Sequence, residues 1–193
     1  MRKLLFFSNN KNKIIEIKKI FNKFNLELLS LNDLKISEEP KESGQTFEEN
    51  AKIKSDYGFN KTGIPCFADD SGICIETLNW KPGVFSKRFL NSFKNSDACF
   101  RSIIKKTKNN GKQNAYFKTS ISLTINENQN IVFNGKIEGK ISDKVKGRFG
   151  FGYDPIFIPK YYKKTLAELS TRKKNQISHR SIAVTKLINF LSN

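Results

Sequence analysis

Apolar residues along the first part of the chain alternate between short continuous runs and helical spacing. Residues 3–8 form an apolar run typical of a buried strand, and residues 11–24 place isoleucine and phenylalanine at helical spacing. A second strand is predicted at residues 26–29, followed by a polar loop over residues 32–45. The chain is therefore expected to open as strand, helix, strand and loop.

A capping-box pattern marks the start of the next helix. Thr46 and Glu49 have the spacing at which each side chain can bond to the backbone N–H of the other, which predicts a helix ending near residue 60. Residues 65–68 and 73–76 then predict two strands, and the acidic segment between them predicts a turn.

The rest of the chain adds a hairpin and further helices. The predicted elements are a basic amphipathic helix over residues 96–108, hairpin strands at 114–125 and 131–141, an irregular glycine-rich stretch at 147–155, a short helix at 165–169 and a last helix from Ser178 to about residue 191. No repeat or linker is present, so we expect one domain over residues 1–193. The order of elements favours a mixed α/β fold with a central twisted sheet.

The composition indicates a folded protein without a membrane span. Hydrophobic residues make up 37% and aromatic residues 12% of the 193 positions, which is too apolar for a disordered chain. No apolar run approaches the roughly 18 residues that a membrane span needs, and the first apolar stretch is too short for a secretory signal. We therefore expect a cytoplasmic protein. Its cysteines, Cys66, Cys74 and Cys99, form no CxxC pair and are expected to be reduced.

The net charge of +17 favours polyanionic partners, which include nucleic acid, anionic membranes and phosphorylated small molecules. The 29 lysines and 6 arginines are spread along the chain and form no basic arm. A generic solvated surface and a dedicated nucleic-acid face both remain open.

A polar segment between the first strand and the first helix could hold phosphate. Hydroxyl and amide side chains, free backbone N–H groups and a helix N-terminus all suit phosphate oxygens, although no Walker pattern is present. Simple capping of the helix by Ser8 or Asn10 is the alternative. The segment consists of Ser8, Asn9, Asn10, Lys11, Asn12 and Lys13.

Two adjacent carboxylates, Asp69 and Asp70, follow an apolar strand. Paired oxygen ligands suit magnesium, and a carboxylate beside the metal could deprotonate an attacking water. A hydrogen-bonded turn with Ser71 and Gly72 is the alternative. Glu42 becomes a third candidate only if its polar loop folds over this pair.

Two segments of the C-terminal part suit a purine base. Glycines alternating with aromatic residues at 149–155 would let the backbone approach a planar ligand while a ring stacks on it. Asp154 could accept hydrogen bonds from base N–H groups. His179, the only histidine, and Arg180 fall in the first turn of the last predicted helix, where a positive charge opposes the helix dipole. A histidine packed under a loop is the alternative.

Taken in chain order, these segments resemble the Ham1-like inosine triphosphate pyrophosphatase family from residue 3 to residue 190. The matching segments are Ser8–Lys13, Glu42–Ala51, Asp69–Gly72, Pro82–Arg88, Gly150–Pro155 and Ile177–Arg180. The resemblance implies Mg²⁺-dependent hydrolysis of inosine, deoxyinosine and xanthosine triphosphates to the monophosphate and pyrophosphate. It also implies an elongated two-lobed α/β protein with its active cleft between the lobes. A homodimer that requires neither membrane nor nucleic acid is expected.

The same resemblance implies a role for each matched residue. Ser8–Lys13 would contact the triphosphate, Glu42 and Asp70 would hold magnesium, and Asp70 would also activate water with the support of Asp69. Phe151 would stack on the purine, and Gly152, Tyr153 and Asp154 would shape the rest of the pocket. Lys174, His179 and Arg180 would close over the nucleotide and read the six-position oxygen of its base. Ser71 would touch the substrate.

Two other functions compete with this one. A non-catalytic nucleic-acid-binding protein is suggested by the net charge, but it leaves the acidic residues unexplained, because carboxylates repel phosphate unless a metal intervenes. A pyrophosphatase for other modified nucleotides is the second alternative. Four residues differ from those common in the family, none of them a proposed ligand or base: Asn9, Lys11, Trp80 and Lys87.

Overall fold

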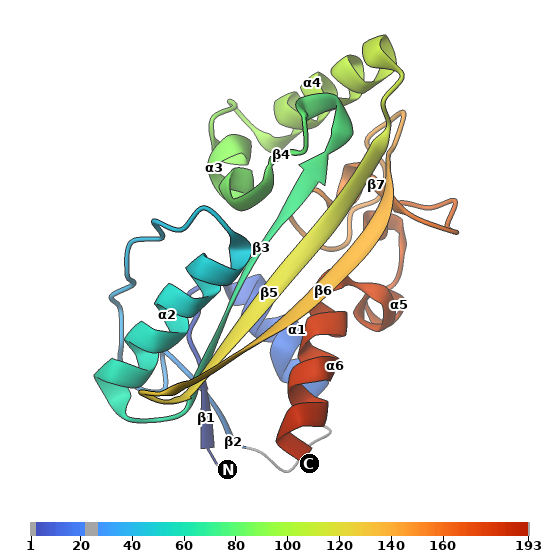
Figure 1. The fold of residues 1–193 in the computed structure, drawn as a ribbon. Helices are drawn as coiled ribbons and strands as arrows, with labels where there is room; N and C mark the ends of the chain where they lie inside the picture. Colours follow the sequence, from blue (N-terminus) through green and yellow to red (C-terminus); the bar gives the residue numbers. More distant parts are fainter. Residues whose placement is uncertain (1–2, 22–26, 193) are drawn as a thin grey trace. The chain divides into compact units, whose positions relative to one another are not determined.

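The computed structural model describes residues 3–21 and 27–192. Its central element is a mixed sheet with the strand order β2-β1-β3-β5-β6-β7, and β4 pairs with β3 (Figure 1). β1 runs parallel to β2 and β3, whereas β3–β4 and β6–β7 are antiparallel pairs. The strands are β1 Lys3–Phe6, β2 Glu27–Ser30, β3 Cys66–Ile75, β4 Lys81–Pro82, β5 Asn114–Asn126, β6 Gln129–Ile141 and β7 Phe157–Pro159.

Six α-helices accompany the sheet in the described residues. They are α1 Lys11–Phe21, α2 Phe47–Thr62, α3 Ser86–Asn91, α4 Ser96–Asn110, α5 Thr171–Ile177 and α6 His179–Ser192. Short 3₁₀ turns lie at Glu76–Leu78, Gly83–Phe85, Asp154–Ile156 and Leu166–Glu168. The predicted mixed α/β class is confirmed. No helix within residues 3–21 and 27–192 is both long and apolar enough to cross a membrane.

The chain divides into two compact units. Unit 1 consists of Met1–Asp70, Thr119–Gly135 and Arg180–Asn193, and unit 2 consists of Ser71–Lys118 and Lys136–His179. Both units therefore draw on distant parts of the chain. The expectation of a single domain with a cleft between two lobes stays a prediction.

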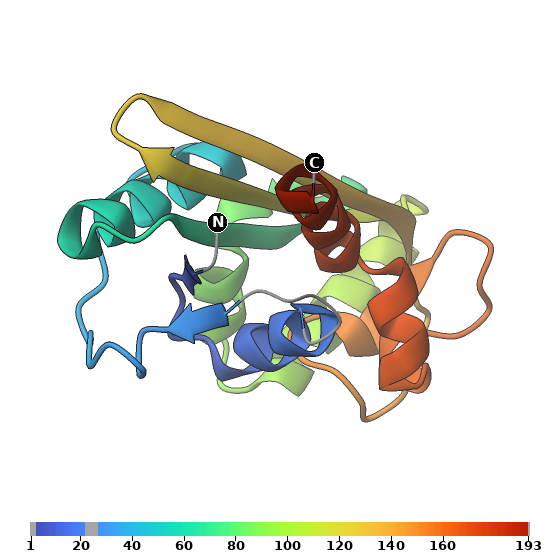
Figure 2. The same cartoon turned by 90° about the horizontal axis from the view of Figure 1, so that it is seen from below.

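Unit 1 has an apolar core on each face of its strands. Successive residues of β1 point to opposite faces, so Leu4 and Phe6 join one cluster while Leu5 and Phe7 join the other. α1 and α6 cover the first cluster, and α2 packs against the second, as Figures 1 and 2 show. The outcome is a helix–sheet–helix arrangement in which α1, β3 and α6 share one core.

Unit 2 is built around a separate core. Phe100 and Ile103 of α4 pack on Ile73 and Ile75, which belong to the second half of β3. The ring of Phe117 on β5 meets that of Phe157 on β7 edge to face at a centroid distance of 4.8 Å, which adds an aromatic contact to this core.

Most of the predicted elements are present. The capping box is confirmed, because the Glu49 N–H donates to Thr46 Oγ1 at 3.1 Å and the Thr46 N–H donates to Glu49 Oε2 at 3.1 Å. The basic helix and the hairpin of β5 and β6 are also confirmed. Residues 22–24 of the predicted first helix and Leu26 of the predicted second strand lie outside the described residues.

The predicted acidic turn is wrong, because Asp69, Asp70, Ser71 and Gly72 continue a single strand, β3. Gly72 is a glycine for a different reason. A Cβ at this position would lie 2.2 Å from the carbonyl oxygen of Gly83, so the residue permits a close backbone approach. The two aspartates are thus held in the middle of a buried strand.

Other boundaries also differ from the prediction. The short helix expected at residues 165–169 is a 3₁₀ turn, and α5 was not predicted. The last helix, α6, begins at His179 directly after Ser178, as predicted. Short elements such as α3, β4 and β7 were not predicted, because runs of two to six residues have no distinctive periodicity.

Candidate active site

The carboxylate of Asp69 is the centre of a buried charge network in unit 1. Its side chain has 0% exposure, and its Oδ2 lies 3.0 Å from Lys13 Nζ on α1 and 3.2 Å from Arg180 Nε on α6. Arg180 also pairs through Nη1 with Glu16 Oε2 at 2.5 Å. Two cations and two anions are therefore paired among side chains that are at most 13% exposed.

These cations decide the ionisation of Asp69. Burial is the largest single influence and would raise the pKa of the carboxyl, but attraction by Lys13, Arg180 and Lys54 outweighs it, so the pKa is lowered. Asp69 is thus an anion throughout the neutral range. Among the described residues its second oxygen, Oδ1, is buried without a hydrogen-bond partner.

Lys54 on α2 joins this network and was not predicted from the sequence. Its Nζ lies 2.6 Å from Glu42 Oε1 and donates to the carbonyl oxygen of Asp69 at 2.8 Å. Burial alone would lower its pKa, but the charges of Asp70, Glu42 and Asp69 raise it. The signal for Lys54 was its place on the buried side of the capped helix, four residues after Asn50 and three after Ala51.

Asn50 connects the loop of Glu42 to the second aspartate. Its Nδ2 donates to Asp70 Oδ2 at 3.3 Å, and its Oδ1 accepts from the Gly44 N–H at 2.8 Å. The polar loop is therefore held against Asp70, which meets the condition under which Glu42 becomes a candidate ligand.

Asp70 differs from its neighbour in charge balance. Burial raises its pKa most, Lys54 and Lys13 lower it, and Glu42 and Asp69 raise it further, with a net upward shift. A carboxylate whose pKa is raised is a stronger base than ordinary aspartate. This arrangement suits a group that takes a proton from water.

Within the Ser8–Lys13 segment the capping alternative is confirmed for Asn10. Its Oδ1 accepts from the N–H groups of Asn12 at 3.1 Å and Lys13 at 3.2 Å, and its own N–H donates to Ser8 Oγ at 3.2 Å. Ser8 is buried, whereas Asn9, Lys11 and Asn12 are exposed. The segment is a folded helix start, and its contact with phosphate stays a prediction.

The acidic residues fit magnesium by their donor chemistry. Glu42 and Asp70 are hard oxygen ligands close enough that each disfavours the charge of the other, which a bound cation would offset. Among the described residues no group of three or more His, Cys, Asp or Glu side chains could hold a metal ion. Magnesium commonly uses one or two carboxylates with water and substrate phosphate, so two ligands suffice.

The second cluster of predicted residues lies in unit 2 and is organised by Asp154. Its Oδ2 accepts from the Phe151 N–H at 2.9 Å and from Lys174 Nζ at 2.7 Å. Lys174 Nζ also lies 4.6 Å from the centroid of the Phe151 ring. Gly150 has φ +79° and a Cβ there would lie 2.1 Å from Asp154 Oδ2, so only glycine allows this tight loop.

Tyr153 and His179 are buried in unit 2. The Tyr153 hydroxyl donates to the Ser86 carbonyl oxygen at 2.7 Å, which fixes the loop to α3. His179 stacks on Phe117 with a centroid distance of 4.7 Å and an interplanar angle of 8°. Ser71 is half-buried on β3, and Gly152 is exposed at φ +63°.

Arg180 has its ion-pair partners in unit 1, whereas Lys174 and His179, with which the family resemblance groups it, belong to unit 2. Its guanidinium lies in unit 1 against Asp69 and Glu16, and the aspartate is 111 positions away in the chain. A role for Arg180 in reading the base therefore stays a prediction, and the pairing with Asp69 is what the structure assigns to it.

Comparison with known proteins shows the family of the chain. A family model described as the Ham1 family matches residues 4–190. The chain belongs to the Ham1 family. The resemblance inferred from the sequence is confirmed.

Two Ham1 relatives are named dITP/XTP pyrophosphatase. That of Christiangramia forsetii is 43% identical over 190 residues, covering 98% of this chain and 99% of the relative. That of Porphyromonas gingivalis is 38% identical over 192 residues, covering 99% of this chain and 98% of the relative.

Solved Ham1 structures have the same fold. The Staphylococcus aureus Ham1 protein has a TM-score of 0.87 at 36% identity, covering 99% of this chain and 98% of that one. A HAM1 protein from Coxiella burnetii has a TM-score of 0.88 at 34% identity, covering 100% of this chain and 99% of that one.

The network predicts that Asp69→Asn strongly destabilises the protein. The substitution leaves Lys13 beside a neutral amide and Arg180 with Glu16 as its anionic partner, and breaking a buried pair costs about 3–5 kcal/mol. Urea unfolding at neutral pH measures the loss. Asp97→Asn is the control, because Asp97 pairs with Arg101 in an exposed position on α4 and should matter little.

The loss of folding stability caused by Asp69→Asn should become smaller at low pH. Because folding lowers the pKa of Asp69, its contribution to stability is full above its unfolded pKa of about 3.9 and disappears as the pH falls toward the folded value. The stability gap between wild type and Asp69→Asn should be constant from about pH 5 to 7 and narrow below about pH 4. A gap that is absent at neutral pH would contradict the network.

Proposed function

We propose that this chain hydrolyses dITP, ITP and XTP to the corresponding monophosphate and pyrophosphate, and so removes non-canonical purine nucleotides from the nucleotide pool. Full-length relatives named dITP/XTP pyrophosphatase support this activity. The observation that carries this proposal is the cluster of Asp70, Glu42 and Lys54. In it the carboxyl group of Asp70 has a raised pKa and lies near the ammonium group of Lys54.

In the proposed reaction Asp70 is the general base. Water gives a proton to Asp70, and the water oxygen forms a bond to the α phosphorus. The anhydride bond between the α phosphorus and the bridging oxygen breaks, and pyrophosphate leaves with that oxygen and its electron pair. The upward shift of its pKa makes Asp70 a better proton acceptor. Asn50 orients the group, because its Nδ2 donates to Asp70 Oδ2 at 3.3 Å.

Lys13 and Lys54 are the proposed partners of the triphosphate. Fixed positive charges in a buried site stabilise the negative charge that develops on phosphate oxygens. Asp69 is a positioning residue in this scheme, since it holds Lys13 at 3.0 Å. The backbone and amide groups of the Ser8–Asn12 segment would supply further hydrogen bonds.

We propose Mg²⁺ as the cofactor, held by Glu42 and Asp70. When bound, it would neutralise phosphate charge and help to orient the triphosphate. Lys54 would keep Glu42 in place, because its Nζ lies 2.6 Å from the Glu42 carboxylate.

The base would be bound by the cluster in unit 2. The half-buried Phe151 offers a ring for stacking, and Asp154 fixes the backbone of Phe151 and the ammonium group of Lys174. Lys174 is a donor only, so it suits the keto oxygen of hypoxanthine or xanthine and not the amino group of adenine. His179 and Tyr153 would support this cluster from the buried side.

The remaining expectations also belong to this proposal. A cytoplasmic location and a homodimer without a need for nucleic acid are consistent with an enzyme of the nucleotide pool. Light scattering from the purified protein tests the dimer, and a mass equal to that of one chain would exclude it.

Replacing Asp70 by Asn should abolish turnover without harming the fold. Loss of a general base costs about 10²–10⁴-fold in rate. Because burial disfavours the charge of Asp70, the neutral amide should leave the melting temperature unchanged or raise it. Pyrophosphate release from dITP measures the rate, with Asp97→Asn as the control. Retained turnover would remove Asp70 as the base.

Replacing Phe151 by Ala should weaken the binding of the nucleotide much more than that of pyrophosphate. Stacking of a base on an aromatic ring contributes about 1–3 kcal/mol, so the affinity for dITP should fall by about 5- to 160-fold. Phe149→Ala is the matched control, since Phe149 is 52% exposed in the same loop. Calorimetry measures the affinity of each variant for dITP and for pyrophosphate. An equal loss of affinity for both ligands would contradict the stacking role.

A further inference from the structure

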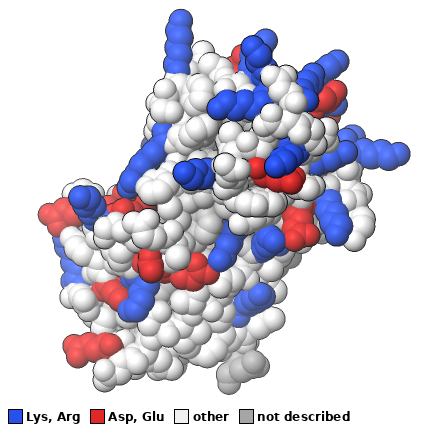
Figure 3. Space-filling model, turned by 45° about the horizontal axis from the view of Figure 1, so that its top comes forward, with Lys and Arg blue, Asp and Glu red and all other residues white. Residues whose placement is uncertain are grey.

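The positive charge of the chain is concentrated in unit 2. Its sequence contains 21 Lys and Arg against 6 Asp and Glu, a net charge of +15, whereas unit 1 contains 14 and 12, a net charge of +2. On the face of unit 2 seen in Figure 3, basic side chains far outnumber acidic ones. The proposed reaction uses Lys13 and Lys54 of unit 1, so almost all of this excess has no part in it.

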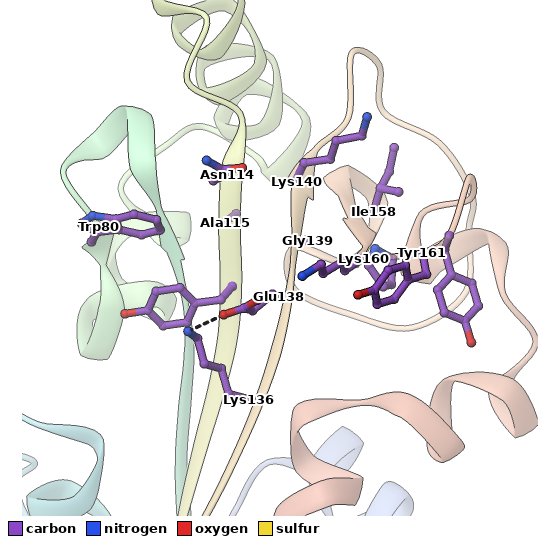
Figure 4. Close-up of a pocket in the computed structure, with 13 residues that line it drawn as sticks. Trp80, Asn114, Ala115, Lys136, Glu138, Gly139, Lys140, Ile158, Lys160 and Tyr161 are labelled. Carbon is purple, nitrogen blue, oxygen red and sulfur yellow. Dashed lines mark hydrogen bonds and ion pairs between the residues drawn. The ribbon is translucent and has the colours of Figure 1, made fainter.

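Unit 2 also contains a cavity with aromatic and basic walls. The cavity has a volume of about 630 Å³ and adjoins a second one of about 490 Å³ that shares several of its lining residues. Figure 4 shows Trp80 on the segment before β4, other lining residues on β5, β6 and β7, and Lys160 and Tyr161 in the loop that follows β7. We call it the aromatic groove and define it by Trp80, Tyr116, Lys136, Lys140, Lys160 and Tyr161.

Two of the three rings of the groove are exposed. Trp80 is 46% and Tyr161 is 93% exposed, although rings of this size are normally buried. Trp80 lies 5.5 Å from Tyr116 between ring centroids, at an interplanar angle of 33°. Trp80 also has φ +62°, a backbone conformation that favours glycine. Neither burial nor backbone preference explains a tryptophan at this position.

The charges of the groove favour an anion. Lys136 Nζ lies 4.4 Å from the centroid of the Tyr116 ring and 2.9 Å from Glu138 Oε1, so the one carboxylate in the lining is neutralised. Lys140 and Lys160 add two further positive charges to the walls. A ligand that fits must therefore combine flat aromatic surfaces with several negative charges.

We propose that the aromatic groove binds single-stranded nucleic acid. Proteins that bind single strands combine a positive groove for the phosphates with aromatic rings on which successive bases stack. The adjoining cavity overlaps the groove at Lys136, Lys160 and Tyr161 and adds Ile137 and Ile177 to its lining. Bases in a duplex are already stacked on one another, so the exposed rings favour a single strand.

Trp80 is the only tryptophan of the chain and reports on the groove directly. Addition of an oligothymidylate or oligouridylate of about 12 nucleotides to the full-length protein in EDTA should quench its fluorescence. Each phosphate contact contributes about −0.7 to the slope of log K against log salt, so three lysines predict a slope of about −2.

Three variants make the test specific. Trp80→Gly relieves the positive φ and should weaken binding about tenfold, measured by anisotropy of a labelled strand. The double variant Lys140→Gln/Lys160→Gln should reduce the salt slope by about 1.4. The matched control Lys105→Gln/Lys108→Gln removes the same charge from the exposed side of α4 and should change the slope much less. All three should release pyrophosphate from dITP at the wild-type rate.

Three results would overturn the proposal. Equal effects of the two lysine pairs would mean diffuse attraction by the net charge. Thymidine monophosphate binding as tightly as the strand would mean a pocket for a single nucleotide. A change of Trp80 fluorescence with protein concentration alone, together with a doubled mass in light scattering, would mean that a second copy of the chain covers the groove.

Discussion

Unit 1 depends on the neutralisation of one buried anion. The carboxylate of Asp69 has no exposed area, and an unpaired charge in such a place costs several kcal/mol. Lys13 and Arg180 offset that cost, so α1, β3 and α6 must each bring one charged side chain to the same point. The first helix, the central strand and the last helix are thus tied together by ion pairs as well as by their shared apolar core.

The same network gives two adjacent aspartates different properties. Burial raises the pKa of both carboxyl groups. Nearby cations outweigh this effect at Asp69, so its pKa is lowered, but they offset it only in part at Asp70, so its pKa stays raised. Neighbouring carboxylates whose pKa values move in opposite directions can take different tasks. Asp69 then organises the cations while Asp70 accepts the proton. In unit 2 Asp154 has a comparable organising position, since it holds Lys174 and the backbone of Phe151.

Features set by neighbouring residues were predictable from the sequence, and features set by distant ones were not. The capping box of Thr46 and the hairpin depend on local spacing and were predicted. Gly72 was misinterpreted as a turn signal, because its actual constraint is the approach of the Gly83 backbone. Family resemblance selected Glu42 and Asp70, but the pairing of Arg180 with Asp69 spans 111 positions and leaves no trace in residue spacing.

The central claim is that the cluster around Asp70 hydrolyses non-canonical purine triphosphates. The most direct test is the rate of pyrophosphate release from dITP, XTP, dATP and dGTP, each in Mg²⁺ and in EDTA. The account predicts fast release from dITP and XTP in Mg²⁺, slow release from dATP, and none in EDTA. The rate with dGTP, which shares the six-position keto oxygen, shows whether a further contact rejects guanine. Equal rates for all four nucleotides would contradict the proposed recognition of the base, and no release from any of them would contradict the proposed reaction.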